Sequence, residues 1–131
     1  MRSKKTHSNC LNIIKPVRVT LDVINSKWKL QIIISIREGN DRYTDIQNSI
    51  PCITPKVLAK ELKELEQHTL IKRIIVDDYP IKIVYKLEPY ADTLCPIINA
   101  MKDWGINHTR TIISKEADKN NVLAINPDFI I

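Results

Sequence analysis

The lysines of residues 54–68 have a spacing that suits contact with a polyanion. On a helix that turns about 100° per residue, three apolar side chains of this segment fall within about 60° of one another. Measured around the helix axis from the first of these, Leu58, three basic side chains fall on the opposite side, at about 140° to 200°. The apolar side chains are Leu58, Leu62 and Leu65, and the basic ones are Lys56, Lys60 and Lys63. Ammonium groups on one helix face can bind phosphates and the acceptor edges of bases. The pattern predicts a helix that packs through its leucines and offers its lysines to a nucleic acid.

A solvated amphipathic helix is the alternative interpretation of the same residues. Glu61, Glu64 and Glu66 lie on its flanks, and Lys60 stands four residues before Glu64, a spacing that pairs charges on many exposed helices. Two neighbouring features favour the interpretation that this helix contacts a nucleic acid. A short helix is expected just before the segment, and a hairpin that carries further lysines is expected just after it. The context therefore favours a helix that reads DNA.

The other reactive side chains form no catalytic or metal-binding pattern. Cys10, Cys52 and Cys95 are too far apart in sequence for a disulfide framework or a zinc pair. The three histidines have no neighbouring ligands, and a turn explains the pair Asp77-Asp78. The sequence contains no phosphate-binding glycine loop, nucleophile elbow or zinc-protease motif. We expect no enzymatic activity, no metal and no cofactor.

Two of the cysteines are candidates for a redox role. Cys10 lies in the basic N-terminal segment, where exposure would let oxidation cross-link two copies of the chain. Cys52 stands just before the expected helix of residues 54–68, whose positive N-terminus stabilises a thiolate. A passive small residue in a turn is the alternative for Cys52. The sequence identifies no small-molecule or redox effector.

The composition describes one ordinary globular domain. The chain has 131 residues, is 44% hydrophobic, and carries a net charge of +5. That excess lies in the first eighteen residues, where Arg2, Lys4, Lys5, Lys15 and Arg18 meet no acid. The charge alone is therefore weak evidence for an anionic partner. No signal-peptide pattern is visible, and no apolar run approaches the roughly 20 residues of a membrane span, so we expect a cytoplasmic protein without membrane contact.

The first elements are a tail and two helices. Residues 1–14 are predicted to be a basic flexible tail. Pro16 is expected in the first turn of a helix with an apolar stripe that includes Val17 and Leu21. Asn25-Ser26 offers a break and a cap before a second helix, which is apolar nearly all round and so expected to be buried. Gly39 suits the left-handed position that ends it.

The next segment predicts the helix-turn-helix. Asp41-Arg42-Tyr43 could form a short strand, and Thr44 is a candidate N-cap for a brief helix that Pro51 ends. Thr54-Pro55 combines a capping oxygen with a proline at the first helical position, and predicts a helix that runs to about His68.

The remaining elements are a hairpin and a long helix. Residues 70–76 are rich in β-branched side chains and residues 81–87 alternate with a period of two, so they predict paired strands. Pro89 is expected to start a last long helix, which Pro96 should bend and Gly105 should weaken or end.

This order of elements is typical of a winged helix-turn-helix, a mainly helical α+β fold. The DNA-binding domain is expected at residues 15–105, and residues 106–131 are expected to form a C-terminal helical extension for dimerisation. A domain of this size has a small core, so the apolar faces of the first and last helices need another surface. A dimer formed by these N- and C-terminal helices would cover them.

An ordered set of short motifs runs from Pro16 to Gly105. They include Lys27-Trp28-Lys29, Arg42-Tyr43-Thr44-Asp45-Ile46, Ile53-Thr54-Pro55-Lys56-Val57-Leu58, Leu94-Cys95-Pro96 and Asp103-Trp104-Gly105. In this order and spacing the chain resembles the HxlR-type bacterial winged-helix transcription regulators, a group close to the MarR type. The family commonly has a cysteine where Lys15 stands and a glycine where Thr69 stands, so a left-handed Thr69 would carry a conformational cost.

The resemblance implies a transcriptional regulator that binds a palindromic double-stranded DNA operator as a homodimer. The residues expected at the DNA are Thr54, Lys56, Val57, Lys60, Lys63 and Arg42, with Lys82 on the wing. The residues expected at the dimer interface are Val17, Leu21, Ile97, Met101 and Trp104. A winged-helix protein-interaction module without DNA binding is the alternative function.

Overall fold

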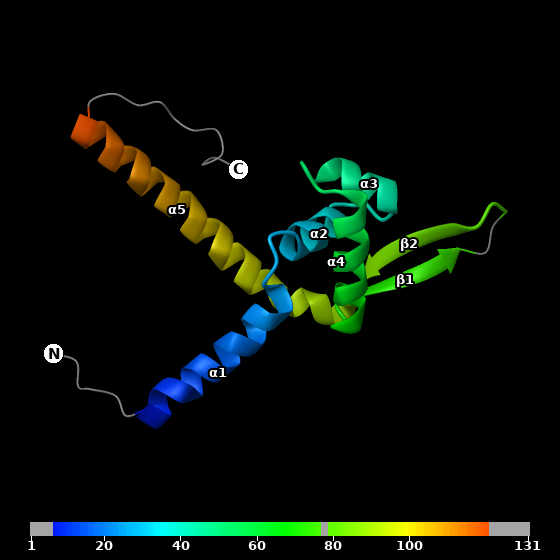
Figure 1. Cartoon of the computed structure of the whole chain (residues 1–131), viewed down its shortest axis with the longest axis horizontal. Coiled ribbons are helices and arrows are strands. Elements are labelled where there is room, and N and C mark those ends of the chain that lie inside the picture. The colour runs from blue at the N-terminus through cyan, green and yellow to red at the C-terminus, as the bar shows by residue number, and fades with distance from the viewer. Residues whose placement is uncertain (1–6, 77–78, 121–131) are drawn as a thin grey trace. The chain divides into compact units, whose positions relative to one another are not determined.

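The protein is mainly helical with one small antiparallel sheet, as the sequence predicted (Figure 1). The computed structural model describes residues 7–76 and 79–120. Its elements are α1 (His7–Ile24), α2 (Lys29–Arg37), α3 (Tyr43–Ser49), α4 (Pro55–Gln67), β1 (Ile71–Val76), β2 (Lys82–Leu87), the 3-10 helix η1 (Pro89–Leu94) and α5 (Cys95–Asn120). They divide into two compact units, residues 1–91 and 92–131. No helix among the described residues is long and apolar enough to cross a membrane.

Helix α1 begins earlier than the sequence predicted. Residues 7–14 were assigned to a flexible tail but are helical, and Pro16 lies inside α1 instead of in its first turn. The remainder of the expected tail, residues 1–6, lies outside the described residues. The apolar spacing explains the difference, because Cys10 and Ile14 continue the stripe of Val17 and Leu21 upstream of the proline. Proline normally disrupts a helix interior, and here the apolar periodicity on both sides of it was the better guide.

Side chains and a glycine set the ends of α2 as expected. The Ser26 hydroxyl accepts hydrogen bonds from the backbone N–H groups of Trp28, at 3.1 Å, and Lys29, at 2.9 Å. At the other end, Gly39 has a φ of 110°, and the Asn40 N–H reaches back to the Ser35 carbonyl at 3.1 Å. The predicted break at Asn25-Ser26 and the predicted glycine stop are both confirmed, whereas the N-cap position of α2 is Trp28, two residues later than predicted.

The expected short strand at residues 41–43 is not formed. Tyr43 is already the first residue of α3, and the N-cap position is Arg42, not Thr44. The segment still lies beside the hairpin, because the Asp41 carbonyl accepts a hydrogen bond from the Tyr85 N–H at 2.7 Å. One such contact ties α3 to β2 without making a third strand.

The predicted hairpin is confirmed. Strands β1 and β2 pair antiparallel, with Ile71 opposite Leu87 and Val76 opposite Lys82. The base of the hairpin joins the core of the first unit. The buried side chains of that core come from α2, α3, α4, the connecting loops and the strands, and include Ile32, Ile33, Ile36, Ile46, Ile53, Leu58, Leu62, Leu65, Leu70, Ile71 and Tyr85. The predicted helix of residues 55–68 therefore packs on a core made by its neighbours.

The last helix differs from its prediction in three ways. Pro89 starts a 3-10 helix, and α5 begins only at Cys95. Pro96 is therefore the second residue of α5, in the first turn, where its missing N–H is not needed, and not inside the helix as predicted. Gly105 does not end the helix, which runs on to Asn120, so the expected boundary between residues 105 and 106 falls inside one helix. A single glycine costs about 1 kcal/mol in a helix interior, which the rest of this 26-residue helix outweighs.

Candidate nucleic-acid interface

The N-terminus of α4 is held by its cap and by α3. Thr54 has extended backbone angles, φ −88° and ψ 155°, and its Oγ1 accepts the Val57 N–H at 3.3 Å. Pro55 is the first helical residue, as the Thr54-Pro55 pair predicted. The Tyr43 hydroxyl of α3 donates a hydrogen bond to the Pro55 carbonyl. Helices α3 and α4 and the turn between them thus form a helix-turn-helix unit whose second helix starts at a fixed point.

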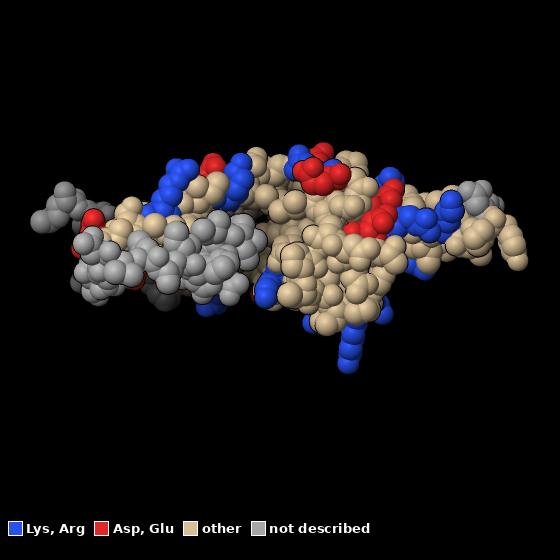
Figure 2. All heavy atoms as spheres, turned by 90° about the horizontal axis from the view of Figure 1, so that it is seen from above, with Lys and Arg blue, Asp and Glu red and all other residues tan. Residues whose placement is uncertain are grey.

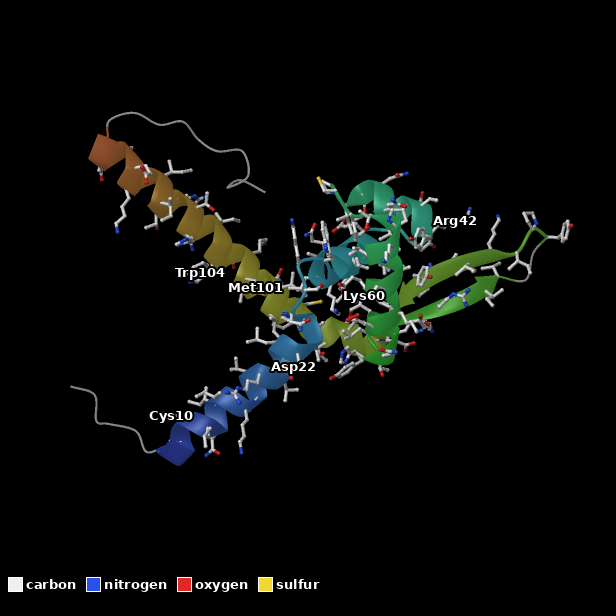
Figure 3. The ribbon with its side chains drawn as sticks, viewed as in Figure 1. Cys10, Asp22, Arg42, Lys60, Met101 and Trp104 are labelled. Atoms are coloured by element: carbon white, nitrogen blue, oxygen red, sulfur yellow. The ribbon has the colours of Figure 1, made fainter. Side chains whose placement is uncertain are left out.

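The two sides of α4 are sorted as the spacing predicted. Leu58 and Leu65 are fully buried and Leu62 is 2% exposed. Lys56, Lys60 and Lys63 are exposed, and 71% of the Lys60 side chain is accessible. Figure 3 labels Lys60 on α4. The helix presents three ammonium groups on the side away from its core.

A buried lysine of α2 forms ion pairs with two glutamates on one flank of α4. The Lys29 Nζ lies 2.7 Å from Glu61 Oε2 and 2.8 Å from Glu64 Oε1. The Lys29 and Glu61 side chains are only 3% and 4% exposed, while Glu64 is 33% exposed. The second oxygen of Glu64 lies 3.6 Å from the Lys60 Nζ, which confirms the predicted pair four residues apart.

Lys29 was missed by sequence reasoning, which expected an apolar α2 and placed Glu61 on a solvated flank. The available signal was a lysine at the start of a helix otherwise full of isoleucines, together with two acids three residues apart on one flank of α4. Long charged side chains are rarely buried unless they are paired, so each group on its own is assigned to solvent.

The same contacts keep Lys29 and Glu64 ionised. Burial alone would lower the pKa of Lys29, but the hydrogen bonds and charges of Glu61 and Glu64 outweigh it and raise that pKa above 10.5. The hydrogen bond from Lys29 is the main cause that lowers the pKa of Glu64 below 4.5, against a smaller opposing effect of burial. Around neutral pH, Lys29 therefore carries its positive charge and Glu64 its negative charge.

The C-terminus of α4 ends in a left-handed residue that is not glycine. The Thr69 N–H bonds the Glu66 carbonyl at 3.0 Å, and the Leu70 N–H bonds the Leu65 carbonyl at 3.1 Å. This pair of bonds is the Schellman pattern, which needs a left-handed residue at the Thr69 position. Thr69 has a φ of 63°, so the residue is left-handed at the position where the family commonly has a glycine, a conformation that disfavours an L-residue.

The lysines of the hairpin share one of its faces. Lys72 lies directly opposite Lys86, and Lys82 lies opposite Val76, which is on the same face as Lys72. The Lys86 ammonium is 3.1 Å from Asp41 Oδ2. Figure 2 shows a row of basic side chains along the hairpin, next to acidic ones. Lys82 is exposed at the first residue of β2. Arg42 is exposed just before α3 (Figure 3).

The residues expected at a dimer interface are exposed apolar side chains. In the first unit, Val17 and Leu21 of α1 are 50% and 53% exposed. In the second unit, Ile97, Met101 and Trp104 of α5 are 36%, 50% and 67% exposed, and Trp104 stacks on His108 with ring centroids 4.6 Å apart. Each helix thus carries apolar surface that nothing in the described chain covers.

Cys10 is exposed on α1, and Cys52 is exposed in the turn before α4 with a φ of 69°. Within the described part of the chain, no group of three or more histidine, cysteine, aspartate or glutamate side chains could hold a metal ion.

Comparisons with known proteins agree with this arrangement. The family model described as HxlR-like helix-turn-helix matches residues 23–112. The HTH-type transcriptional regulator YdeP of Bacillus subtilis is 36% identical to this chain over 102 residues, which are 78% of this chain and 80% of YdeP. The crystal structure of the HTH-type regulator YtcD, also known from Bacillus subtilis, shares 36% identity and a TM-score of 0.69 over 72% of this chain and 96% of YtcD. The reduced form of the redox regulator HypR shares 34% identity and a TM-score of 0.67 over 76% of this chain and 98% of HypR.

YdeP and YtcD are named as HTH-type transcriptional regulators, and the solved structures of YtcD and HypR are similar in fold to this chain. Since the family model covers more than half of the chain, the protein belongs to the HxlR-like helix-turn-helix family and is a transcriptional regulator of the helix-turn-helix type.

Proposed function

We propose that this regulator binds a specific double-stranded DNA operator with α4 in the major groove. The observation that carries the proposal is the sorting of α4, with three buried leucines on one side and the exposed Lys56, Lys60 and Lys63 on the other. A helix in the major groove contacts base edges mainly through its N-terminal residues, so Thr54, Lys56 and Val57 are the first candidates. Lys60 and Lys63 follow one and two turns later, where they would meet phosphates.

The β1–β2 hairpin supports the same docking as a wing. Lys82 is exposed at the start of β2, beside the turn. With α4 in the major groove, the Lys82 ammonium would reach a backbone phosphate at the adjacent minor groove. Arg42, exposed at the start of α3, is proposed as a further phosphate contact. Such contacts set the register of the protein on the duplex but do not read its sequence.

We propose a homodimer because α1 and α5 each expose apolar side chains that a second copy would cover. Val17 and Leu21 on α1, and Ile97, Met101 and Trp104 on α5, are the proposed contacts. Contiguous apolar surface of this kind marks an interaction site. A two-fold dimer places two copies of α4 on half-sites about one helical turn apart, or a multiple of it, so the operator is proposed to be palindromic.

Oxidation is proposed as one way to control this dimer. HypR is a redox regulator by its title. On this chain Cys10 and Cys52 are both exposed, so an oxidant can reach either of them. Cys10 is the stronger candidate because it continues the apolar stripe of α1 that is proposed to face the partner copy.

Fluorescence anisotropy with labelled duplexes tests the proposed function. The first probe is the intergenic DNA beside the protein's own gene, and the control is a scrambled duplex of the same length and composition. Lys60→Ala is expected to weaken binding and to lower the slope of log affinity against log salt by about one unit, because each phosphate contact releases about one counterion. Lys115→Ala removes an equally charged, exposed side chain from α5 and is expected to change neither quantity.

Binding that is unaffected by both Lys60→Ala and Lys56→Ala would refute the placement of α4. No preference of the wild-type protein for any duplex, including those selected from a random library, would favour the protein-interaction module instead.

A further inference from the structure

We propose that Lys29 is a positioning residue for DNA recognition: from inside the protein, it sets the orientation in which α4 presents its lysines. The inference rests on the proposed function and adds a residue that neither touches DNA nor lies in the helix-turn-helix. Lys29 is the first residue of α2 and is 2% exposed, so its effect has to pass through α4.

The geometry of the contact fixes α4 in two respects. One ammonium group binds two carboxylates three residues apart on α4, at 2.7 Å and 2.8 Å. Glu61 and Glu64 lie on one flank, at about 60° and 120° from Leu58 around the helix axis. Rotating α4 about its axis, or sliding it along the axis, would move both carboxylates relative to the Lys29 ammonium and could not keep both distances. The leucines on their own do not impose such a limit, because apolar contact is not directional.

Stability does not explain the presence of this buried charge. Removing an ammonium and a carboxylate from water is costly, and buried ion pairs replaced by apolar residues of similar volume often leave a protein equally stable or more stable. Lys29 and Glu61 are as buried as the leucines around them. What the pair adds over an apolar contact is direction, since charge-assisted hydrogen bonds hold only in a narrow range of distance and angle.

The contact also continues to the exposed face of α4. Glu64 binds Lys29 through Oε1 and lies 3.6 Å from Lys60 through Oε2. Lys29 therefore fixes the carboxylate beside which the Lys60 ammonium rests, and Lys60 is one of the proposed DNA contacts. A helix turned by a small angle would move both Lys60 and the N-terminal residues relative to the groove, where reading a base requires hydrogen-bond geometry.

The test is a variant in which the ion pair is replaced without leaving a charge unpaired. In the double variant Lys29→Met with Glu61→Leu, apolar side chains of similar volume fill the site, and Glu64, which is one-third exposed, can be solvated. Urea unfolding of the full chain is expected to show equal or greater stability. Affinity for a scrambled duplex and the salt slope are expected to stay unchanged, because no phosphate contact is removed. Affinity for the operator is expected to fall about tenfold or more, the range for one lost base contact.

Two further variants make the result decisive. Ser35→Ala with Ser49→Ala removes another partly buried polar contact of α2, the 2.5 Å hydroxyl pair with α3, and is expected to keep the preference for the operator. Glu61→Gln keeps the shape of the side chain and removes its charge, and is expected to lose part of that preference even if the double variant does not fold. A full preference for the operator in Glu61→Gln and in any folded double variant would overturn the proposal.

Amide hydrogen exchange of α4 without DNA separates this inference from the proposed function. Faster local exchange in α4 is expected for Glu61→Gln and for the double variant but not for the serine pair, and in the double variant it is expected without a loss of global stability. If the wild-type protein prefers no duplex, the proposed function fails while the exchange measurement still decides the role of Lys29. Unchanged amide exchange in α4 of these variants would then overturn the proposal that Lys29 fixes the orientation of α4.

Discussion

Thr69→Gly is expected to stabilise the protein, although it removes a side chain. Thr69 has a φ of 63°, in the left-handed region, where an L-residue is disfavoured by about 1–2 kcal/mol. Glycine removes that penalty but loses about 0.5–1 kcal/mol more conformational entropy on folding. The Thr69 side chain is exposed, so little packing is lost, and its N–H bond to the Glu66 carbonyl remains. The net gain is expected to be about 0.5–1 kcal/mol.

Urea unfolding followed by circular dichroism measures this gain. With a denaturant slope of about 2 kcal/mol per molar, the midpoint is expected to rise by about 0.3–0.5 M. Both proteins have to be compared at one concentration, because association of copies also shifts the midpoint. Thr111→Gly is the matched control, since Thr111 is exposed inside α5, where glycine is expected to lower stability by a few tenths of a kcal/mol.

Opposite signs for the two threonines are the essential result. If Thr69→Gly lowers the midpoint as Thr111→Gly does, then the left-handed conformation carries no cost at this position, and the explanation of the end of α4 is wrong.

Four further predictions concern the DNA-binding face, the buried pair, the dimer and the cysteine of α1. Lys56→Ala is expected to weaken operator binding, and anisotropy that is unchanged by it would remove this residue from the interface. The pKa of Glu64 is lowered from 4.5, so its stabilisation is present above pH 4.5 and is lost as the pH falls through the folded value. The pKa of Lys29 is raised from 10.5, so its stabilisation is present below pH 10.5 and is lost as the pH rises through the folded value. Urea unfolding measured at a series of pH values is expected to show a loss of stability at low pH and another at high pH. Stabilisation by the Lys29–Glu64 pair that increases as the pH falls would contradict the direction of the Glu64 pKa shift. Trp104→Glu puts a charge on a side chain that is 67% exposed on α5 and is expected to yield monomers in analytical ultracentrifugation, whereas an unchanged mass would exclude this face from the dimer. Diamide, which oxidises two thiols to a disulfide, is expected to give a cross-linked dimer band on non-reducing gels, and persistence of that band in Cys10→Ser would exclude this cysteine.

The elements that local chemistry specifies were predictable from the sequence. Thr54-Pro55 sets the start of α4, and the alternation of residues 81–87 identifies β2, because a cap and a strand period act within a few residues. The left-handed position of Thr69 was indicated by the resemblance alone, because the family commonly has a glycine there. The exposure of Lys56, Lys60 and Lys63 followed from the same helical spacing.

Prolines were misread where their position within a helix mattered. The sequence predicted a helix start at Pro16 and a bend at Pro96, yet Pro16 lies inside α1 and Pro96 lies in the first turn of α5. Proline is compatible with the first turn and costly in the interior, so each assignment depended on knowing where the helix began. That point depends on residues upstream: the stripe from Cys10 for α1, and the 3-10 turn from Pro89 for α5.

Lys29 shows why the supporting part of the site could not be read from spacing. Its partners Glu61 and Glu64 are 32 and 35 residues away, and no periodicity relates α2 to α4. Helical spacing separates an apolar side from a charged side, but it treats every flank as solvated. The flank of α4 that faces α2 is not solvated, and its two acids three residues apart form a site for one cation. In a helix-turn-helix of this kind, acids on the flank of the DNA-facing helix are therefore candidates for contacts with the helix behind it, and a lone lysine in that apolar helix is the side chain to examine first.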